Sequence, residues 1–269
     1  MQDINFWEPG PNGIPQLAGG TFGGRTVEGA RCIHGNSLFD WVRQYHQGVL
    51  GLDKAVGRLV SALEESNQLE NTLIVFTSDQ GFAWGQHGFR TKLAPYDANI
   101  RSPLIVSMPG TIPEGKVVPH PVAGVDLIPT FFSFAGIKQP WKMHGHDLTP
   151  LLKDPKSKWD HPALVSFTGR NYGKDTHRIP DDPDQHYLND VPWYVSLRKE
   201  RYKYIRTLVE GEIEELYDIE NDPEELTNLA LSKSHAKVLQ AYRRALIAEL
   251  RRTDAGIVDN LPTIKRLGD

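Results

Sequence analysis

The chain has 269 residues, of which 39% are hydrophobic and 24% are charged, and this composition is ordinary for a globular protein. Its formal net charge of −4 gives no long-range attraction to nucleic acid, and no apolar run approaches the length of a transmembrane helix, so we predict neither a nucleic-acid partner nor a transmembrane segment. Cys32 is the single cysteine, which excludes an internal disulfide.

The first part of the chain is predicted to be loop. Residues 1–7 lack the basic and apolar regions of a signal peptide, and residues 8–35 are rich in glycine and proline. A loop of this length before the first helix is uncommon in a complete fold. We therefore expect the chain to begin within a domain.

A long amphipathic helix is predicted over residues 37–65. Its apolar residues recur at steps of three and four positions, and Asn36 or Ser37 can serve as its N-cap. Two apolar runs then predict strands at residues 72–77 and 103–108. Because these runs are apolar almost throughout, we expect parallel strands that are buried on both faces.

The second half of the chain is predicted to alternate between helix, loop and sheet. A helix is expected near residues 126–136, with Asp126 as its cap. Residues 153–192 are polar and contain several prolines, which indicates loop. Short β-rich pieces over residues 193–218 predict an antiparallel meander, and apolar residues at helical spacing predict a last helix near 233–252.

These elements predict three regions. Residues 1–152 would form the end of an α/β domain, residues 153–192 a variable loop region, and residues 193–269 a small α+β subdomain.

An aspartate and a carboxamide stand at the carboxyl end of the first predicted strand, in the run Thr77-Ser78-Asp79-Gln80-Gly81. Ligands of α/β sheets bind beyond the carboxyl ends of the strands. The oxygens of Asp79 and Gln80 suit a hard cation such as calcium or magnesium. A strand that ends in Asp-x-Gly is also often only a turn, so both interpretations remain open on these residues alone.

Further motifs follow this run in a definite order. Gly85-Gln86-His87-Gly88 comes first, then Lys92, Tyr96 and Arg101, and then the second strand, which ends at Pro109-Gly110. This order resembles the sulfatase family of the alkaline phosphatase superfamily. The resemblance runs from about Tyr45 to about Ala230, and its later parts are Asp126-Leu127-Ile128-Pro129-Thr130, Gly145-His146-Asp147-Leu148-Thr149-Pro150-Leu151-Leu152, Arg201-Tyr202-Lys203-Tyr204-Ile205 and Glu215-Leu216-Tyr217-Asp218.

The resemblance implies an α/β fold. The chain would contain the C-terminal part of an alkaline-phosphatase-like α/β/α sulfatase domain, followed by a small antiparallel β subdomain with a C-terminal helix. It also implies a sulfuric ester hydrolase, similar to bacterial exported enzymes that act on sulfated sugars, and hence a periplasmic or secreted protein. The substrate would be a sulfated sugar or another sulfate monoester.

The resemblance also implies roles for particular residues. Asp79 and Gln80 match two ligands of a single calcium ion. Lys92 matches a lysine that contacts the sulfate, and an ammonium group can both bind an anionic oxygen and stabilise the departing alkoxide. His87 either reaches the catalytic site or fixes the loop that contains it.

Three further residues are candidates for substrate binding. Arg101 would contact the substrate, or instead orient loops and pair with a carboxylate. His177 and His186 lie in the polar stretch where sulfatases carry substrate-selecting loops, so either could recognise sugar hydroxyls, although a solvated surface position is the alternative.

One essential part of the family's chemistry is missing from this sequence. In the family, a cysteine or serine within Cys/Ser-x-Pro-x-Arg is oxidised to formylglycine, and no such motif occurs here. Cys32-Ile33-His34-Gly35-Asn36 has neither the proline nor the arginine. We therefore expect the N-terminal half of the catalytic domain to be missing and the isolated chain to be inactive. The alternatives are a phosphoester hydrolase of the same superfamily and a non-catalytic remnant or accessory protein.

Overall fold

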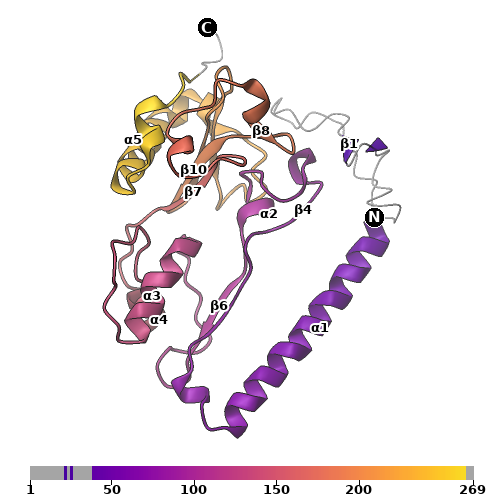
Figure 1. Cartoon of the computed structure of the whole chain (residues 1–269), viewed down its shortest axis with the longest axis vertical. Helices are drawn as coiled ribbons and strands as arrows, with labels where there is room; N and C mark the ends of the chain where they lie inside the picture. Colours follow the sequence, from indigo (N-terminus) through magenta and orange to yellow (C-terminus); the bar gives the residue numbers. More distant parts are fainter. Residues whose placement is uncertain (1–20, 23–24, 27–37, 265–269) are drawn as a thin grey trace. The chain divides into compact units, whose positions relative to one another are not determined.

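The computed structural model describes residues 21–22, 25–26 and 38–264 (Figure 1). The described residues divide into two units. Among the described residues, unit 1 contains those up to Ser78 together with Phe82–Lys92 and Ser102–Gly115, and unit 2 contains Asp79–Gly81, Leu93–Arg101 and those from Lys116 onward. The division at residues 152 and 192 stays a prediction. Among the described residues, no helix is both long and apolar enough to cross a membrane.

The N-terminal stretch is described only in part. β1 (Thr21–Phe22) and β2 (Arg25–Thr26) pair as a short antiparallel ladder. The rest of the predicted loop, Cys32 and the two candidate N-caps at positions 36 and 37 lie outside the described residues.

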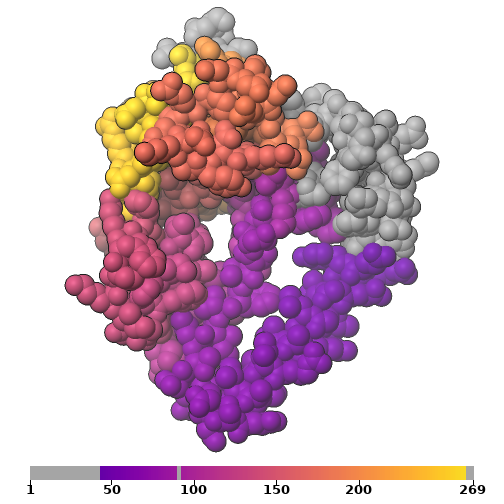
Figure 2. Space-filling model, in the orientation of Figure 1, coloured from indigo at the N-terminus to yellow at the C-terminus, as the bar shows by residue number. Residues whose placement is uncertain are grey.

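Unit 1 contains the predicted long helix and short strands. Its elements in the described part of the chain are α1 (Leu38–Glu65), β3 (Ile74–Thr77), β4 (Ala83–Trp84), β5 (Arg90–Thr91) and β6 (Leu104–Ser107), with 3-10 turns at Leu69–Asn71 and Gln86–Gly88. The helix predicted from the apolar spacing is confirmed. Four apolar side chains along α1, which is indigo in Figure 2, are at least half exposed: Tyr45, Leu50, Leu52 and Leu59.

The predicted strands exist, but the prediction that they are parallel and doubly buried is wrong. β3 and β6 pair antiparallel, with Val75 opposite Val106, and Ile105 is 61% exposed. A parallel pair needs a crossover that carries the chain to the opposite end of the sheet. Here the segment between the strands returns to the end where β3 finishes, so β6 runs back along it. An apolar run marks a strand but does not specify the direction of its partner.

The first part of unit 2 contains two short helices, α3 (Leu127–Phe134) and α4 (Thr149–Lys153). Hydrogen bonds to the side chains of Asp126 and Thr130 connect them. The predicted helix is therefore confirmed, but the side chain of Asp126 does not cap it. One carboxylate oxygen instead accepts the N–H of Ala123 at 2.8 Å and the other accepts the N–H of His146 at 2.7 Å. Thr130 Oγ1 accepts the N–H of Leu148 at 2.8 Å. These bonds hold the turn before α4 against the start of α3.

Gly145 lies in the turn before α4, where that turn packs closely against the start of α3. A Cβ atom at this position would lie 2.0 Å from the carbonyl oxygen of Val125, so backbone would have to move. Gly145→Ala is expected to lower the unfolding free energy by about 1–3 kcal/mol, as overpacking does elsewhere. Chemical denaturation of the full chain measures this loss. Gly124→Ala is the matched control, because nothing lies within 4 Å of its added Cβ, and equal losses in both variants would contradict the expectation.

The second part of unit 2 is an antiparallel sheet covered by one long helix. The strand order is β12-β11-β10-β7, and the helix α5 (Ala236–Arg252) packs against β10 and β11. The strands are β7 (Ala163–Phe167), β10 (Tyr194–Lys199), β11 (Tyr202–Thr207) and β12 (Glu214–Asp218). The predicted meander and last helix are confirmed, and β7 joins the sheet from the stretch that was predicted to be loop.

Other short elements of unit 2 connect these parts. They are α2 (Asp97–Ile100), β8 (Tyr187–Leu188), β9 (Val191–Pro192) and 3-10 turns at Gly124–Asp126, Gly173–Thr176, Pro183–Gln185, Leu229–Leu231, Lys233–His235 and Gly256–Asn260.

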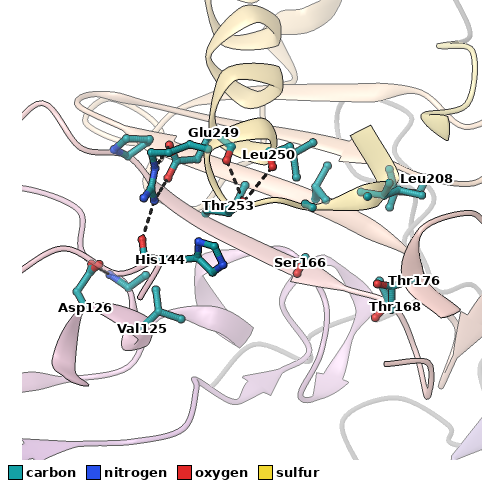
Figure 3. Close-up of a pocket in the computed structure, with 18 of the residues that line it drawn as sticks. Val125, Asp126, His144, Ser166, Thr168, Thr176, Leu208, Glu249, Leu250 and Thr253 are labelled. Carbon is teal, nitrogen blue, oxygen red and sulfur yellow. Dashed lines mark hydrogen bonds and ion pairs between the residues drawn. The ribbon is translucent and has the colours of Figure 1, made fainter. Parts of the chain in front are cut away.

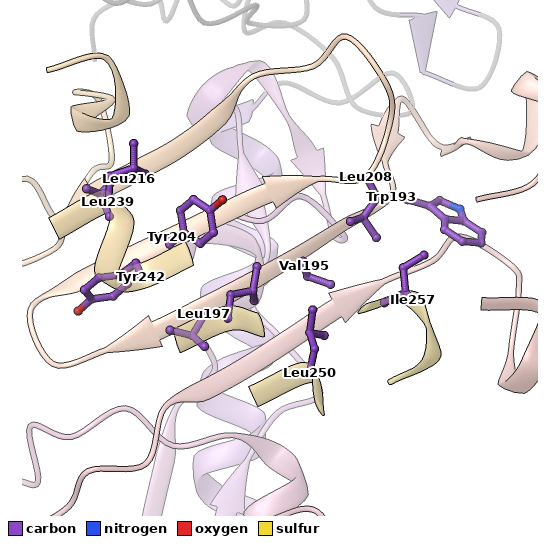
Figure 4. Close-up of a cluster of buried hydrophobic side chains, with 11 residues drawn as sticks. Trp193, Val195, Leu197, Tyr204, Leu208, Leu216, Leu239, Tyr242, Leu250 and Ile257 are labelled. Atoms are coloured by element: carbon purple, nitrogen blue, oxygen red, sulfur yellow. The ribbon is translucent and has the colours of Figure 1, made fainter. Parts of the chain in front are cut away.

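The core lies between α5 and the sheet (Figure 4). From α5 it receives Leu239, Tyr242, Leu246 and Leu250, which share one face of the helix. From the sheet it receives residues that alternate along each strand, including Leu197, Tyr204 and Leu216, which lie opposite one another across the ladder. The intervening residues must therefore point to the other face of the sheet.

Candidate functional site

The predicted metal ligands Asp79 and Gln80 lie in the turn after β3. Asp79 is exposed, and its Oδ1 accepts the N–H of Gln80 at 2.9 Å. Gln80 is half-buried, and its Oε1 accepts the N–H of Leu93 at 3.4 Å. The carboxamide oxygen is therefore oriented by the backbone of a later segment.

Gly81 brings this turn against α2. A Cβ at Gly81 would lie 2.5 Å from the carbonyl oxygen of Ala98 and 2.8 Å from that of Arg101, which only a glycine avoids. The backbone of Arg101, a predicted substrate ligand, therefore lies beside the turn. Its side chain is exposed, and its N–H donates to the carbonyl oxygen of Asp97 at 2.9 Å.

His87 and Lys92 belong to unit 1, in and after the hairpin β4–β5. His87 is 9% exposed and has a φ of 53°, a left-handed conformation that few residues other than glycine adopt. The turn around it is closed by bonds from the N–H of Gly88 to Gly85 at 2.9 Å and from the N–H of Phe89 to Gln86 at 3.0 Å. Lys92 follows β5 and is half-buried. Their catalytic roles stay predictions.

His177 and His186 lie in loops of unit 2. The Nε2–H of His186 donates to the carbonyl oxygen of Pro180 at 2.7 Å, which closes the loop around it. His177 is exposed, and its ring lies so close to Gly256 that a Cβ there would be 2.5 Å from His177 Cγ. Both histidines therefore have packing roles, and their part in sugar recognition stays a prediction.

Sequence reasoning missed a buried layer of polar residues on the face of the sheet opposite α5. At its centre is Lys203, which is 1% exposed. Its Nζ donates to Asp97 Oδ1 at 2.7 Å and also forms an ion pair with Glu225, itself 1% exposed. The N–H of Asp97 donates to Glu225 Oε2 at 2.5 Å. The first residue of α2 is thus held by a buried cation and a buried carboxyl group.

Burial changes the protonation of this layer. Burial raises the pKa of Glu225 and the charge of Asp97 acts in the same direction, while Lys203 opposes both, and the resulting pKa is about 7. A neutral Glu225 leaves Lys203 with one charged partner, Asp97, so that the buried charges balance.

Tyr96, which the family resemblance singled out by its spacing, belongs to the same layer. Its hydroxyl donates to Glu215 Oε2 at 3.2 Å, and the hydroxyl of Tyr217 donates to the same oxygen. Burial raises the pKa of both Tyr96 and Glu215. One signal in the sequence could have found the layer. Lys203 and Glu215 occupy strand positions that alternate with core residues, which places both on the second face.

A pocket of about 280 Å³ lies elsewhere in unit 2, and none of the predicted site residues lines it (Figure 3). Arg252 is the cation among the described residues that line it, and its guanidinium is bound by Glu249 and by the carbonyl oxygen of His144. Burial lowers the pKa of His146, which disfavours a second positive charge. This lining does not suit a sulfate ester, since a sulfate needs a cation that is not already neutralised.

The residues after β3 fit part of a calcium site. Asp79 and Gln80 supply the oxygen donors that calcium prefers. Calcium takes six to eight such ligands, and the described residues contain no group of three or more His, Cys, Asp or Glu side chains that could hold a metal ion. The described chain therefore offers a partial donor set.

Family models match most of the chain. Residues 85–253 match the model for the C-terminal part of N-sulphoglucosamine sulphohydrolase, and residues 16–137 match the sulfatase model. An N-acetylglucosamine-6-O-sulfatase of Bacteroides thetaiotaomicron is 31% identical over 87% of this chain and 40% of its own length. The chain thus spans about two fifths of that relative.

Solved structures agree with these matches. A protein in complex with its substrate D-glucosamine-2-N,6-O-disulfate has a TM-score of 0.64 and 28% identity, over 78% of this chain and 40% of the other. A phosphonate monoester hydrolase of Agrobacterium radiobacter has a TM-score of 0.62 and 27% identity, over 75% of this chain and 39% of the other. The mixture of helices and antiparallel sheet in this chain is thus that of the C-terminal part of these enzymes, and the chain belongs to the sulfatase family.

Proposed function

We propose that this chain is part of a sulfuric ester hydrolase that acts on a sulfated saccharide. The observation that carries the proposal is the likeness, over most of this chain, to an N-acetylglucosamine-6-O-sulfatase. The structure of a relative bound to a disulfated glucosamine supports the same substrate class. Because the chain spans about two fifths of these proteins, the activity would belong to a longer polypeptide or to a complex.

The residues of this chain would divide the work. Lys92 would bind a sulfate oxygen and stabilise the negative charge on the alcohol oxygen as its bond to sulfur breaks. Asp79 and Gln80 would supply some of the oxygen ligands of a calcium ion. When bound, this ion would neutralise the charge of the sulfate. Arg101, His177 and His186 would contact the saccharide. The nucleophile would come from a Cys/Ser-x-Pro-x-Arg motif outside this sequence.

A phosphoester hydrolase is the second candidate, since a phosphonate monoester hydrolase shares the fold at a similar TM-score. Both reactions place negative charge on oxygens around a central atom, so the same lysine and cation would serve either one. The third candidate is a non-catalytic accessory protein.

A chimera distinguishes these candidates. This chain would replace the aligned region of the Bacteroides thetaiotaomicron relative, and the product would be assayed with glucosamine 6-sulfate, a phosphate monoester and a phosphonate monoester. We expect turnover of the sulfate ester, and a loss of about tenfold to a hundredfold in Lys92→Met, because a hydrogen bond to a charged group is removed. Lys138→Met, which removes a lysine outside the predicted site, is the control for the loss of a positive charge.

Each candidate has its own outcome. Faster turnover of the phosphonate than of the sulfate would favour the phosphoester hydrolase, and a folded chimera without turnover would favour the accessory protein. Turnover by the isolated chain that Lys92→Met abolishes would contradict the need for an external nucleophile.

A further inference from the structure

The second face of the sheet in unit 2 fastens one segment, Leu93–Arg101, at three points. The hydroxyl of Tyr194, in β10, donates to the carbonyl oxygen of Leu93 at 2.8 Å. Tyr96 is bonded to Glu215, and Asp97 to Lys203. Each of these sheet residues is at most 7% exposed, so the bonds are shielded from water. We call Leu93–Arg101 the anchored segment.

The backbone of Leu93 has an unusual conformation, which the anchoring holds in place. Its φ is 92°, which is a strained value for a bulky residue. Such a conformation persists only where the surroundings hold it in place. Both backbone polar groups of Leu93 are held, since its C=O accepts from Tyr194 and its N–H donates to Gln80 Oε1.

The anchored segment in turn supports the turn that carries the predicted metal ligands. Gly81 packs on the carbonyl oxygens of Ala98 and Arg101, and Gln80 receives the N–H of Leu93. A continuous series of contacts therefore leads from the hydroxyl of Tyr194 through Leu93 to the carboxamide of Gln80.

We propose that Tyr194 is a positioning residue: by holding the carbonyl of Leu93 it directs the Leu93 N–H at Gln80 Oε1, and so orients Gln80 as an oxygen ligand for a hard divalent cation. The inference rests on the proposed function, which assigns Gln80 to such a cation. Hydrogen bonds that orient metal ligands are commonly worth tenfold to a hundredfold in metal affinity. Tyr194 lies 101 positions from Leu93 in the sequence, although the two residues are hydrogen-bonded in the fold.

Two readouts test the proposal, one on the full chain and one on the chimera described above. Tyr194→Phe removes the hydroxyl and keeps the ring. Tyr204→Phe is the matched control, because that tyrosine lies on the neighbouring strand, is fully buried and donates to Glu214 Oε2 at 2.8 Å, on the opposite face of the sheet. The first readout is the hydrogen-exchange rate of the Leu93 amide in the full chain by NMR, and the second is the calcium Kd of the chimera by calorimetry.

In Tyr194→Phe we expect exchange at Leu93 to accelerate by about tenfold and the calcium Kd to rise by about tenfold or more. Tyr204→Phe should leave both unchanged. Unaltered exchange at Leu93 in Tyr194→Phe, or equal acceleration in both variants, overturns the positioning role. Absence of calcium binding by the unaltered chimera overturns the calcium assignment of the proposed function, and the exchange rates in the full chain then still decide whether Tyr194 holds Leu93.

Discussion

Replacing Lys203 with methionine is expected to lower the unfolding free energy of the full chain by about 3–5 kcal/mol at pH 8. Lys203 is 1% exposed and is bonded to both Asp97 and Glu225. Methionine fills a similar volume but carries no charge, so the buried carboxyl group of Glu225 and the partly buried one of Asp97 would remain without their cation. Removal of one member of a buried ion pair typically costs this much. Guanidinium denaturation followed by circular dichroism measures the loss.

Lys142→Met provides the control for this variant. Lys142 and its partner Asp254 are 68% and 66% exposed, and such exposed pairs contribute little to stability because water screens them. A loss in Lys203→Met no greater than that in Lys142→Met would show that the buried layer does not depend on its cation. The loss in Lys203→Met should shrink at pH 5, because Glu225 then carries a proton and needs no positive partner.

The elements that could be predicted from the sequence are those whose signal is local. α1 and α5 each repeat apolar residues at helical spacing over many positions, and both helices are confirmed. The antiparallel strands β10, β11 and β12 follow one another with short connections, which favour pairing between neighbours. In these cases the pattern and the partner lie in the same stretch of chain.

The predictions failed where the partner is distant. The apolar runs of β3 and β6 marked strands but not their antiparallel direction. Asp126 looks like a helix cap in the sequence, but its Oδ1 accepts from a residue 20 positions later. Residue type limits what a side chain can bond, whereas the fold decides which partner it meets.

The same distinction applies to the candidate site. The family motif made Asp79, Gln80 and Lys92 candidates because these residues lie close together along the chain. The residues that hold the anchored segment could not be found in this way, since Lys203 is 106 positions from Asp97. The strained φ of Leu93 has no sequence signal, because leucine is an ordinary residue in most conformations.

Glu225 is expected to make the stability of the chain fall as the pH rises from 5 to 8. Burial raises its pKa to about 7, above the ordinary value that it has in the unfolded chain. Between these two values the folded chain holds a proton that the unfolded chain has released, so unfolding becomes easier as the pH rises. The stabilisation is complete below the unfolded pKa and is lost as the pH passes the folded pKa near 7. The change between pH 5 and pH 8 should be about 2–3 kcal/mol.

Comparison with Glu225→Gln isolates this contribution, because the amide keeps the shape of the side chain but does not titrate. Other groups change with pH as well. The pKa of Glu215 is also raised by burial, and that of His146 is lowered by burial, so the two act in opposite directions. Both groups are present in the unaltered chain and in Glu225→Gln. Their contributions therefore cancel when one curve of unfolding free energy against pH is subtracted from the other. Parallel curves would mean that Glu225 is already ionised in the folded chain, and that Lys203 is then balanced by two carboxylates at neutral pH.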